Sequence, residues 1–203
     1  GVQTCALPIF IDAGQGLVRI LTLAPEHDAG GRVTRLATSQ GIVVAAGHTD
    51  ASLDDLRSAI DAGLSMVTHL GNGCPMILPR HDNIIQRALH LRDHLWLSFI
   101  ADGVHIPFHA LRNYLDLALP GGRCLVTTDA MSAAGLGPGI HRISRWTVEV
   151  KEDLAAWAPD GSHLLGSALS MPRAVDNLLH KAGLDAAAVR MLTETNPRKS
   201  VGL

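Results

Sequence analysis

The feature that most constrains the fold is a series of five short apolar runs that recur every 23 to 30 residues along the chain. The runs are rich in β-branched or large apolar residues: LVRILTL from residue 17, IVVAAG from 42, SMVTHL from 65, LWLSFIA from 95 and CLVTTD from 124. Their length and near-continuous apolarity are typical of parallel strands that are buried on both faces. The runs therefore predict five strands of a parallel sheet.

Segments with helical spacing separate the later runs. Residues 52–63 place apolar side chains on one stripe and begin with Ser52 as the predicted N-cap. Residues 81–94 and 107–119 show the same spacing, and Pro107 is predicted at the first helical position of its segment. The repeating unit is therefore a strand followed by a helix.

Repeated parallel units of this kind build either an open doubly wound sheet or a closed barrel. No G-x-G-x-x-G or G-x-x-x-x-G-K-[ST] motif follows any run, and this absence favours the barrel. After the fifth run the pattern changes, because residues 139–166 alternate apolar and polar side chains and turn at Asp160-Gly161. This segment predicts a hairpin-like insertion, and helices are expected over 167–183 and 185–197.

Composition limits the classes of function. The chain has 203 residues, 47% of them hydrophobic, which is enough for a sizeable core. A net charge of −2 with interspersed signs gives no reason to expect nucleic acid as a partner, and no apolar stretch approaches the roughly 20 residues of a membrane span. Three scattered cysteines without C-x-x-C spacing favour a reducing cytoplasm. Residues 1–9 do not lead into the pattern that follows and are expected to be a non-native leader.

Titratable residues follow each predicted strand. In a parallel barrel the carboxyl ends of the strands open on one face, where catalytic groups gather. Each of these residues, considered alone, is equally consistent with a structural role. Such a role is a hydrogen-bonded loop residue, a helix cap or, for Glu26, a solvated carboxylate. The residues are Glu26, His48, His69, Asp102, His105 and Asp129.

The combination of these residues carries more weight than any one of them. Asp129 directly follows a buried run, where an unpaired carboxylate would cost several kcal/mol. His48 and His69 end adjacent predicted strands, and His105 and Asp129 follow the next two. Imidazole and carboxylate groups suit zinc or a similar divalent metal, which lowers the pKa of bound water from about 15.7 to about 7. The sequence thus predicts a divalent metal centre, with zinc or a similar ion, and an acid/base partner.

Seven segments in order carry a resemblance to a known family. They are VRILTLAPE (18–26), AAGHTDAS (45–52), VTHLGNGCPM (67–76), IADGVHI (100–106), LVTTDAMSAAG (125–135), LLGSALSMPRAVDNLL (164–179) and NPRKSVGL (196–203). On these motifs the chain resembles the N-acetylglucosamine-6-phosphate deacetylases of the amidohydrolase superfamily. The resemblance implies an incomplete TIM-type (β/α)8 barrel over residues 10–203, comprising strands 4–8. It also implies that the amino-terminal strands and β-sandwich are missing, so that the chain is roughly the second half of an enzyme.

The resemblance also implies roles for individual residues. His48 and His69 match two ligands of the catalytic metal, with Zn²⁺ the expected ion. His105 matches a histidine that contacts the substrate and helps to polarise the acetyl carbonyl. Asp129 matches the general base that takes a proton from water and returns it to the leaving amine. The residues that match substrate contacts are Asn72 and Gly73 for the sugar phosphate, Arg80 for the phosphate across a dimer interface, and Leu165 for the acetyl pocket.

The implied activity is hydrolysis of the N-acetyl group of N-acetylglucosamine 6-phosphate by a homodimer, with the chain alone weakly active or inactive. Two alternatives stay open. One is an amidohydrolase that acts on a different N-acyl sugar or a cyclic amide, because Gly71, Gly73 and Cys74 stand where the family has bulkier residues. The other is a non-catalytic ligand-binding fragment. In either case the two glycines are expected to let backbone amides approach a phosphate closely.

Overall fold

The computed structural model describes residues 2–203, and for residues 2–7 it describes the backbone alone. Gly1 lies outside the described residues, so the leader predicted over residues 1–9 falls partly outside them. The backbone from Val2 onward forms a helix that the sequence pattern did not predict. The helices are α1 (Val2–Gly14), α2 (Arg32–Ser39), α3 (Leu53–Asp61), α4 (Ile84–His90), α5 (Phe108–Ala118), α6 (Met171–His180), α7 (Ala186–Arg190) and α8 (Asn196–Ser200).

The five predicted strands are all present. They are β1 (Ile20–Leu23), β2 (Val43–Ala46), β3 (Met66–Val67), β4 (Trp96–Ile100) and β5 (Cys124–Thr127). Four more strands follow, namely β6 (Gly139–Ile143), β7 (Trp146–Val150), β8 (Ala155–Trp157) and β9 (Leu164–Ser167). The fold is therefore mixed α/β, with a parallel sheet and an antiparallel sheet.

The chain divides into two compact units, which are described separately. The first unit comprises Gly1–Ser98, Gly121–Arg123 and Arg198–Leu203, and the second comprises Phe99–Pro120 and Cys124–Pro197. No helix among residues 2–203 is both long enough and apolar enough to cross a membrane.

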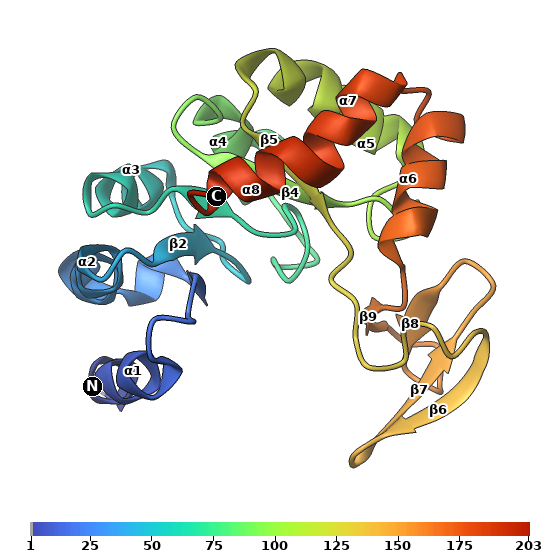
Figure 1. Cartoon of the computed structure of the whole chain (residues 1–203), viewed down its shortest axis with the longest axis horizontal. Coiled ribbons are helices and arrows are strands. Elements are labelled where there is room, and N and C mark those ends of the chain that lie inside the picture. Colours follow the sequence, from blue (N-terminus) through green and yellow to red (C-terminus); the bar gives the residue numbers. More distant parts are fainter. Residues whose placement is uncertain (1) are drawn as a thin grey trace. The chain divides into compact units, whose positions relative to one another are not determined.

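In the first unit, β1, β2, β3 and the start of β4 pair in parallel in chain order, with Leu23 opposite Ala46 and Val67 opposite Leu97. Helices α1, α2 and α3 lie in a row beside these strands (Figure 1). The fully buried side chains of the unit include Leu56 of α3 and Leu97 of β4. Burial on both faces explains why β2, β3 and β4 appear in the sequence as continuous apolar runs. The expectation of burial was wrong for β1, whose residues are exposed or half-buried.

Helix α3 begins where the sequence predicted, because the Ser52 hydroxyl accepts from the Asp55 amide while the Asp55 carboxylate accepts from the Ser52 amide. This capping box satisfies two amide groups that the first helical turn leaves without partners. The prediction for α5 was off by one position. Pro107 is the N-cap, with an extended ψ of 140°, and the helix starts at Phe108.

In the second unit, the structure differs from the sequence prediction in two places. The segment predicted as hairpin-like is a four-stranded antiparallel sheet in the order β6-β7-β8-β9 (Figure 1). Val148 and Val150 of β7 pack in a small core of their own with Ala156 of β8. The short strands β8 and β9 were missed because neither is long enough to show an alternating pattern.

The last predicted helix, 185–197, is also more complex. A π-helical segment, Met191–Thr195, lies between α7 and α8, and the helical path continues to Ser200. Pro197 has no amide N–H, so the regular hydrogen-bond pattern cannot pass through it, and a widened turn precedes it. The side chain of Asn196 instead donates to the carbonyl of Cys124, 2.7 Å away, at the start of β5.

Candidate active site

His48 and His69 lie together in the first unit, as the sequence predicted. They follow β2 and β3, and because these strands are parallel neighbours their carboxyl ends lie side by side. The two ring centroids are 4.9 Å apart and the ring planes meet at 83°. His69 is buried, whereas His48 is exposed.

Both histidines have left-handed backbone conformations. The φ angle is +52° at His48 and +33° at His69, and Asp129 in the second unit has a φ of +48°. Non-glycine residues with positive φ are uncommon, and such backbone strain concentrates at functional sites. Among the described residues only six non-glycine positions share this property, and three of them are residues that the sequence picked out for chemistry.

The loop that carries His48 is held by Glu26. One carboxylate oxygen of Glu26 accepts a very short hydrogen bond from the Thr49 hydroxyl, and the other accepts from the Asp50 amide at 3.0 Å. Thr49 is 4% exposed, and its hydroxyl also accepts from the Ala51 amide. Glu26 is exposed, as its reading as a solvated carboxylate held, and it is also a structural partner of the loop after β2.

Arg87 of α4 holds the same loop from another side. Its guanidinium donates to the carbonyl of Ala51 at 3.0 Å and pairs with the Asp50 carboxylate at 3.5 Å. It also pairs with Asp82 at 2.6 Å. The pKa of Arg87 is raised, chiefly by the hydrogen bond to Asp82. The loop after β2 is therefore held by hydrogen bonds to the carboxylate of Glu26 and from the guanidinium of Arg87.

His69 is held through its backbone. Its amide donates to the hydroxyl of Ser98 at 2.8 Å, in place of the ladder bond that a continuing strand would make. Ser98 is 2% exposed, and its carbonyl accepts from the Leu70 amide at 2.8 Å. On the other side, the backbone and side-chain amides of Asn72 both donate to the His69 carbonyl, at 2.9 and 3.0 Å. The buried histidine is therefore fixed at both its N–H and its carbonyl.

The glycine-rich loop after β3 lies directly against His48. A Cβ atom on Gly73 would overlap the His48 ring, coming within 2.7 Å of Cγ and 2.8 Å of Cε1. Gly73 also has a φ of +68°, which a side chain disfavours. Since the imidazole occupies the space where a side chain would be, the position requires glycine for packing against His48.

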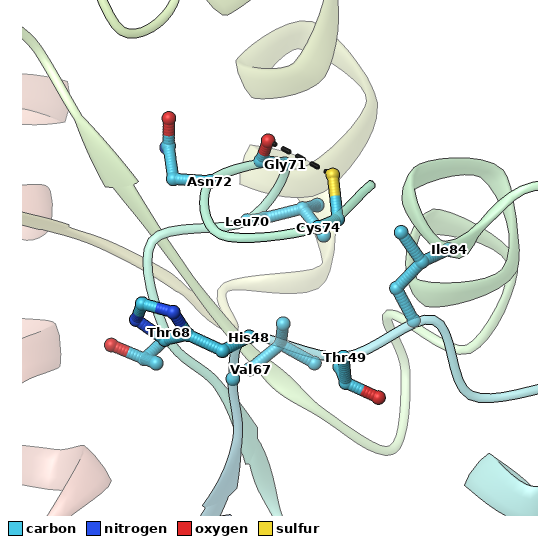
Figure 2. A pocket seen from close by; sticks show the side chains of 10 residues that line it. His48, Thr49, Val67, Thr68, Leu70, Gly71, Asn72, Cys74 and Ile84 are labelled. Atoms are coloured by element: carbon cyan, nitrogen blue, oxygen red, sulfur yellow. Dashed lines mark hydrogen bonds between the residues drawn. The ribbon is translucent and has the colours of Figure 1, made fainter. Parts of the chain in front are cut away.

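A pocket with an empty volume of about 200 Å³ opens beside this loop. Figure 2 shows the residues around it, with the hydrogen bond from the Cys74 thiol to the Gly71 carbonyl drawn as a dashed line; its length is 3.2 Å. Burial, together with the charge of Asp50, raises the pKa of the Cys74 thiol. The wall is mixed, because His48 and Asn72 face it along with Leu70 and Ile84.

Two neighbouring imidazoles are groups that can bind a divalent metal ion. Edge-to-face rings at this spacing suit two ligands of one ion, but a catalytic zinc site ordinarily uses three protein ligands. Among the side chains that the structure describes, those of residues 8–203, no group of three His, Cys, Asp or Glu is arranged to hold a metal ion. The pair therefore supplies an incomplete ligand set by itself.

In the second unit, Asp102 and His105 form a close pair. Asp102 Oδ2 lies 2.5 Å from His105 Nδ1, and the side chains are 0% and 7% exposed. Burial alone would raise the pKa of Asp102, but the hydrogen bond and charge of His105, together with two backbone amides, hold the pKa of this carboxyl below its ordinary value. Asp102 also begins a turn, because its carboxylate accepts from the amides of Val104 and His105.

Asp129 does not have the environment that the sequence predicted. It directly follows β5, yet it is exposed, so the argument from an unpaired buried carboxylate was wrong. The strand ends two residues earlier at Thr127, and the left-handed φ at Asp129 turns the chain there. The next residue, Ala130, pairs with Ser167 of β9. An exposed carboxylate at this point is accessible to a ligand and to water.

The remaining predicted contact residues are placed differently from one another. Arg80 is exposed in the loop before α4. Leu165 of β9 is half-buried and packs against the small core of the antiparallel sheet, beside Met131. Asn72 lines the pocket, and Gly73 packs against His48.

The sequence reading missed Ser98 and Arg87. Each acts on a loop far away in sequence, 29 and 36 residues from its partner. The only local signal for Ser98 was a single polar residue inside an otherwise apolar strand, LWLSFIA. Such a residue needs a hydrogen-bond partner when it is buried, and this could have marked it.

Comparison with known proteins gives consistent matches. The chain is 34% identical over 193 residues to N-acetylglucosamine-6-phosphate deacetylase of Bos taurus, covering 92% of this chain and 46% of that protein. It is 28% identical over 202 residues to N-acetylgalactosamine-6-phosphate deacetylase of Escherichia coli, covering 100% of this chain and 52% of that protein. The chain therefore spans about half the length of the curated relatives it matches. No protein-family model matches the chain.

Solved structures agree with these relatives. N-acetyl-D-glucosamine-6-phosphate deacetylase from Mycobacterium smegmatis, in complex with N-acetyl-D-glucosamine-6-phosphate, superposes with a TM-score of 0.84 at 31% identity. The match covers 97% of this chain and 52% of that one. The enzyme from Pasteurella multocida superposes with a TM-score of 0.82 at 26% identity. The resemblance expected from the sequence motifs is thus confirmed along nearly the whole chain.

Proposed function

Because the chain is homologous along nearly its whole length to the N-acetylglucosamine-6-phosphate deacetylases, we propose that it is part of a hydrolase that removes the acetyl group of N-acetylglucosamine 6-phosphate. The products are glucosamine 6-phosphate and acetate. The proposal concerns the whole enzyme, of which the chain corresponds to about half. Its five parallel strands are proposed to be five of the eight strands of a TIM-type barrel.

The observation that carries the proposal is the His48–His69 pair. Two imidazoles 4.9 Å apart, on two strained strand ends, are fixed by separate hydrogen-bond networks. Maintaining left-handed backbone at both residues costs about 1–3 kcal/mol each. Two histidines with no function would not explain that cost, whereas two ligands that must meet one ion would.

We propose that His48 and His69 hold a divalent metal, with zinc the expected ion, and that a third ligand comes from outside this chain. When bound, such a metal supplies an acidic water and stabilises negative charge on the acetyl oxygen. Without the third ligand, the chain alone is expected to bind zinc weakly and to have little or no activity. Zinc content and acetate release by the purified chain test this, and stoichiometric zinc with ordinary turnover would contradict it.

The remaining steps involve groups of this chain. Asp129 is the proposed general base, and its exposed carboxylate accepts a proton from the attacking water and returns it to the leaving amine. The proton balance closes, because the amine leaves protonated and acetate carries the oxygen from water. General acid/base catalysis of this kind contributes about 10²- to 10⁴-fold in rate. His105 is the proposed contact to the acetyl carbonyl.

Two phosphorylated sugars are candidates for the substrate. Asn72, Gly73 and Arg80 are the proposed contacts for the sugar phosphate, and Leu165 for the acetyl group. A match to an N-acetylgalactosamine-6-phosphate deacetylase along the full chain supports the epimeric sugar as the second candidate. Rates on the two phosphorylated sugars, and on N-acetylglucosamine without phosphate, separate these candidates.

The test of the proposed reaction uses the full-length protein that contains this sequence. We expect acetate release from N-acetylglucosamine 6-phosphate, and we expect Asp129→Asn to abolish it while leaving metal content unchanged. Asp61→Asn, an exposed carboxylate at the end of α3, is the matched control and should retain wild-type turnover. Turnover that survives in Asp129→Asn would refute the assignment of the base. The homodimer and the cytoplasmic location expected from the sequence stay predictions.

A further inference from the structure

The carboxylate of Asp102 is fully buried, and both its oxygens have partners. Oδ1 accepts from the backbone amides of Val104 and His105, each at 2.9 Å. Oδ2 lies 2.5 Å from Nδ1 of the His105 ring. A side chain with 0% exposure that makes three short contacts has a fixed orientation. The two oxygens therefore cannot exchange places without breaking bonds to the backbone.

The charge state of Asp102 decides the direction of its contact with the histidine. The hydrogen bond to His105 and the two amides outweigh burial and hold the pKa of Asp102 below its ordinary value, so the group is a carboxylate at neutral pH. A carboxylate can only accept hydrogen bonds. Nδ1 of His105 must then be the donor and carry a proton.

The surrounding structure holds this pair in place. Gly103 has a φ of +84°, and a Cβ atom there would overlap the ring of Phe108, so the tight turn from Asp102 to His105 requires glycine. On the other side of the turn, the buried side chain of Asn177 in α6 donates to the carbonyl of Ala101 at 2.9 Å. The end of β4 is thus anchored immediately before Asp102.

We propose that Asp102 is a positioning residue that holds the His105 proton on Nδ1 and so presents Nε2 as the ring atom that acts on a ligand. Within the part of the chain that the structure describes, Nδ1 makes the hydrogen bond of this ring, and Nε2 is left available. The placement and the tautomer follow from this chain alone. The identity of the ligand, an N-acetyl group, rests on the proposed function.

The arrangement limits what His105 can do to an acetyl group. Because Nδ1–H is committed to Asp102, a singly protonated ring can only accept a hydrogen bond at Nε2. Donation to the acetyl oxygen requires a second proton on Nε2, and the buried carboxylate of Asp102 then compensates the positive charge of the ring. Asp102 therefore fixes Nε2 as the ring nitrogen that meets the acetyl oxygen.

The substitution Asp102→Asn makes a sharp test, because the backbone fixes the orientation of the new amide. The two amide donors of Val104 and His105 require an oxygen at the Oδ1 position, so the NH2 group must take the Oδ2 position. It then donates to Nδ1, which has to become the acceptor. The proton of the neutral ring is expected to move to Nε2.

The experiment is ¹⁵N NMR of the histidine rings in the full chain, under conditions where His105 is neutral. The wild-type ring should show a protonated Nδ1 and an unprotonated Nε2, and Asp102→Asn should exchange the two signals. Asp176→Asn is the matched control, because Asp176 and His180 form an exposed pair at 3.6 Å. That variant should leave the tautomer of His105 unchanged.

The outcomes are distinct from those of the deacetylase assay. A wild-type ring with its proton on Nε2, or an exchanging mixture of the two tautomers, overturns the proposal. A variant that keeps the proton on Nδ1 overturns it as well, because Asp102 would not be its cause. If Asp102→Asn does not fold, the wild-type spectrum still decides the tautomer. If the full-length protein did not deacetylate the sugar phosphate while His105 showed the expected tautomer, the proposed function would be refuted and this inference would stand.

Discussion

Replacing Gly73 with alanine would test the packing of the glycine-rich loop against His48. The new Cβ atom would overlap the imidazole, with Cγ at 2.7 Å and Cε1 at 2.8 Å. The His48 ring is the part that can move, because it is exposed. We therefore expect Gly73→Ala to rotate the ring away from the loop and to disturb its pairing with His69.

The expected loss of stability has two parts. Alanine in a left-handed conformation costs about 1–2 kcal/mol, and the φ of Gly73 is +68°. Forcing a ring off its preferred rotamer adds about 0.5–1.5 kcal/mol. The free energy of unfolding is therefore expected to fall by about 1.5–3.5 kcal/mol. Urea denaturation followed by circular dichroism measures this change.

Gly41→Ala is the matched control for Gly73→Ala. Gly41 has a similar φ of +74°, but a Cβ atom there has nothing within 4 Å. The control should show the backbone cost alone, about 1–2 kcal/mol, with the ring signals of His48 and His69 unchanged in NMR spectra. If Gly73→Ala moves those signals no more than Gly41→Ala does, the packing argument is wrong.

Three further substitutions or measurements test the support of the site. Ser98→Ala should lower the free energy of unfolding by about 1–3 kcal/mol, because the amide of His69 loses its acceptor, whereas Ser39→Ala on an exposed helix should change little. Glu26→Gln should destabilise the loop after β2 by about 0.5–1.5 kcal/mol, seen as faster amide hydrogen exchange there. Burial raises the pKa of Cys124 to about 12, so a thiol reagent at pH 8 should label it only after unfolding.

Each of these three predictions would be contradicted by a specific result. Equal effects of the two serine substitutions would show that the hydroxyl in β4 is not needed by the buried amide. If amide hydrogen exchange in the loop after β2 did not change, Glu26 would not stabilise that loop. Rapid labelling of the folded protein at Cys124 would mean that β5 opens far more readily than its burial implies.

The parallel strands could be predicted from the sequence because a strand that is buried on both faces has a continuous apolar sequence. Val44, Leu97 and Val126 are buried in the middle of their strands, and no polar alternation interrupts the runs. The strands of the antiparallel sheet have a weaker sequence pattern. Its strand β8 has only three residues, Ala155–Trp157, and its turn signals could fit one hairpin as well as two.

The pairing of His48 with His69 could also be predicted, because parallel neighbours place their carboxyl ends at one edge. The residues that hold the two histidines in place could not be predicted from the sequence. Glu26 and Ser98 act through hydrogen bonds to residues 23 and 29 positions away, and local patterns do not record such distances. The exposure of Asp129 was mispredicted for a related reason: the buried run ends at Val126, and the chain turns outward before the carboxylate.

The most direct test of the central claim is a zinc titration of the chain, followed by NMR of the histidine rings. Of the 11 histidines, His48 and His69 should shift together as zinc is added, with the same dependence on zinc concentration. Replacing either one with alanine should abolish the shift of the other. If only one of the two responds, or if the other nine respond equally, the pair is not a metal-binding unit and the account of this site is wrong.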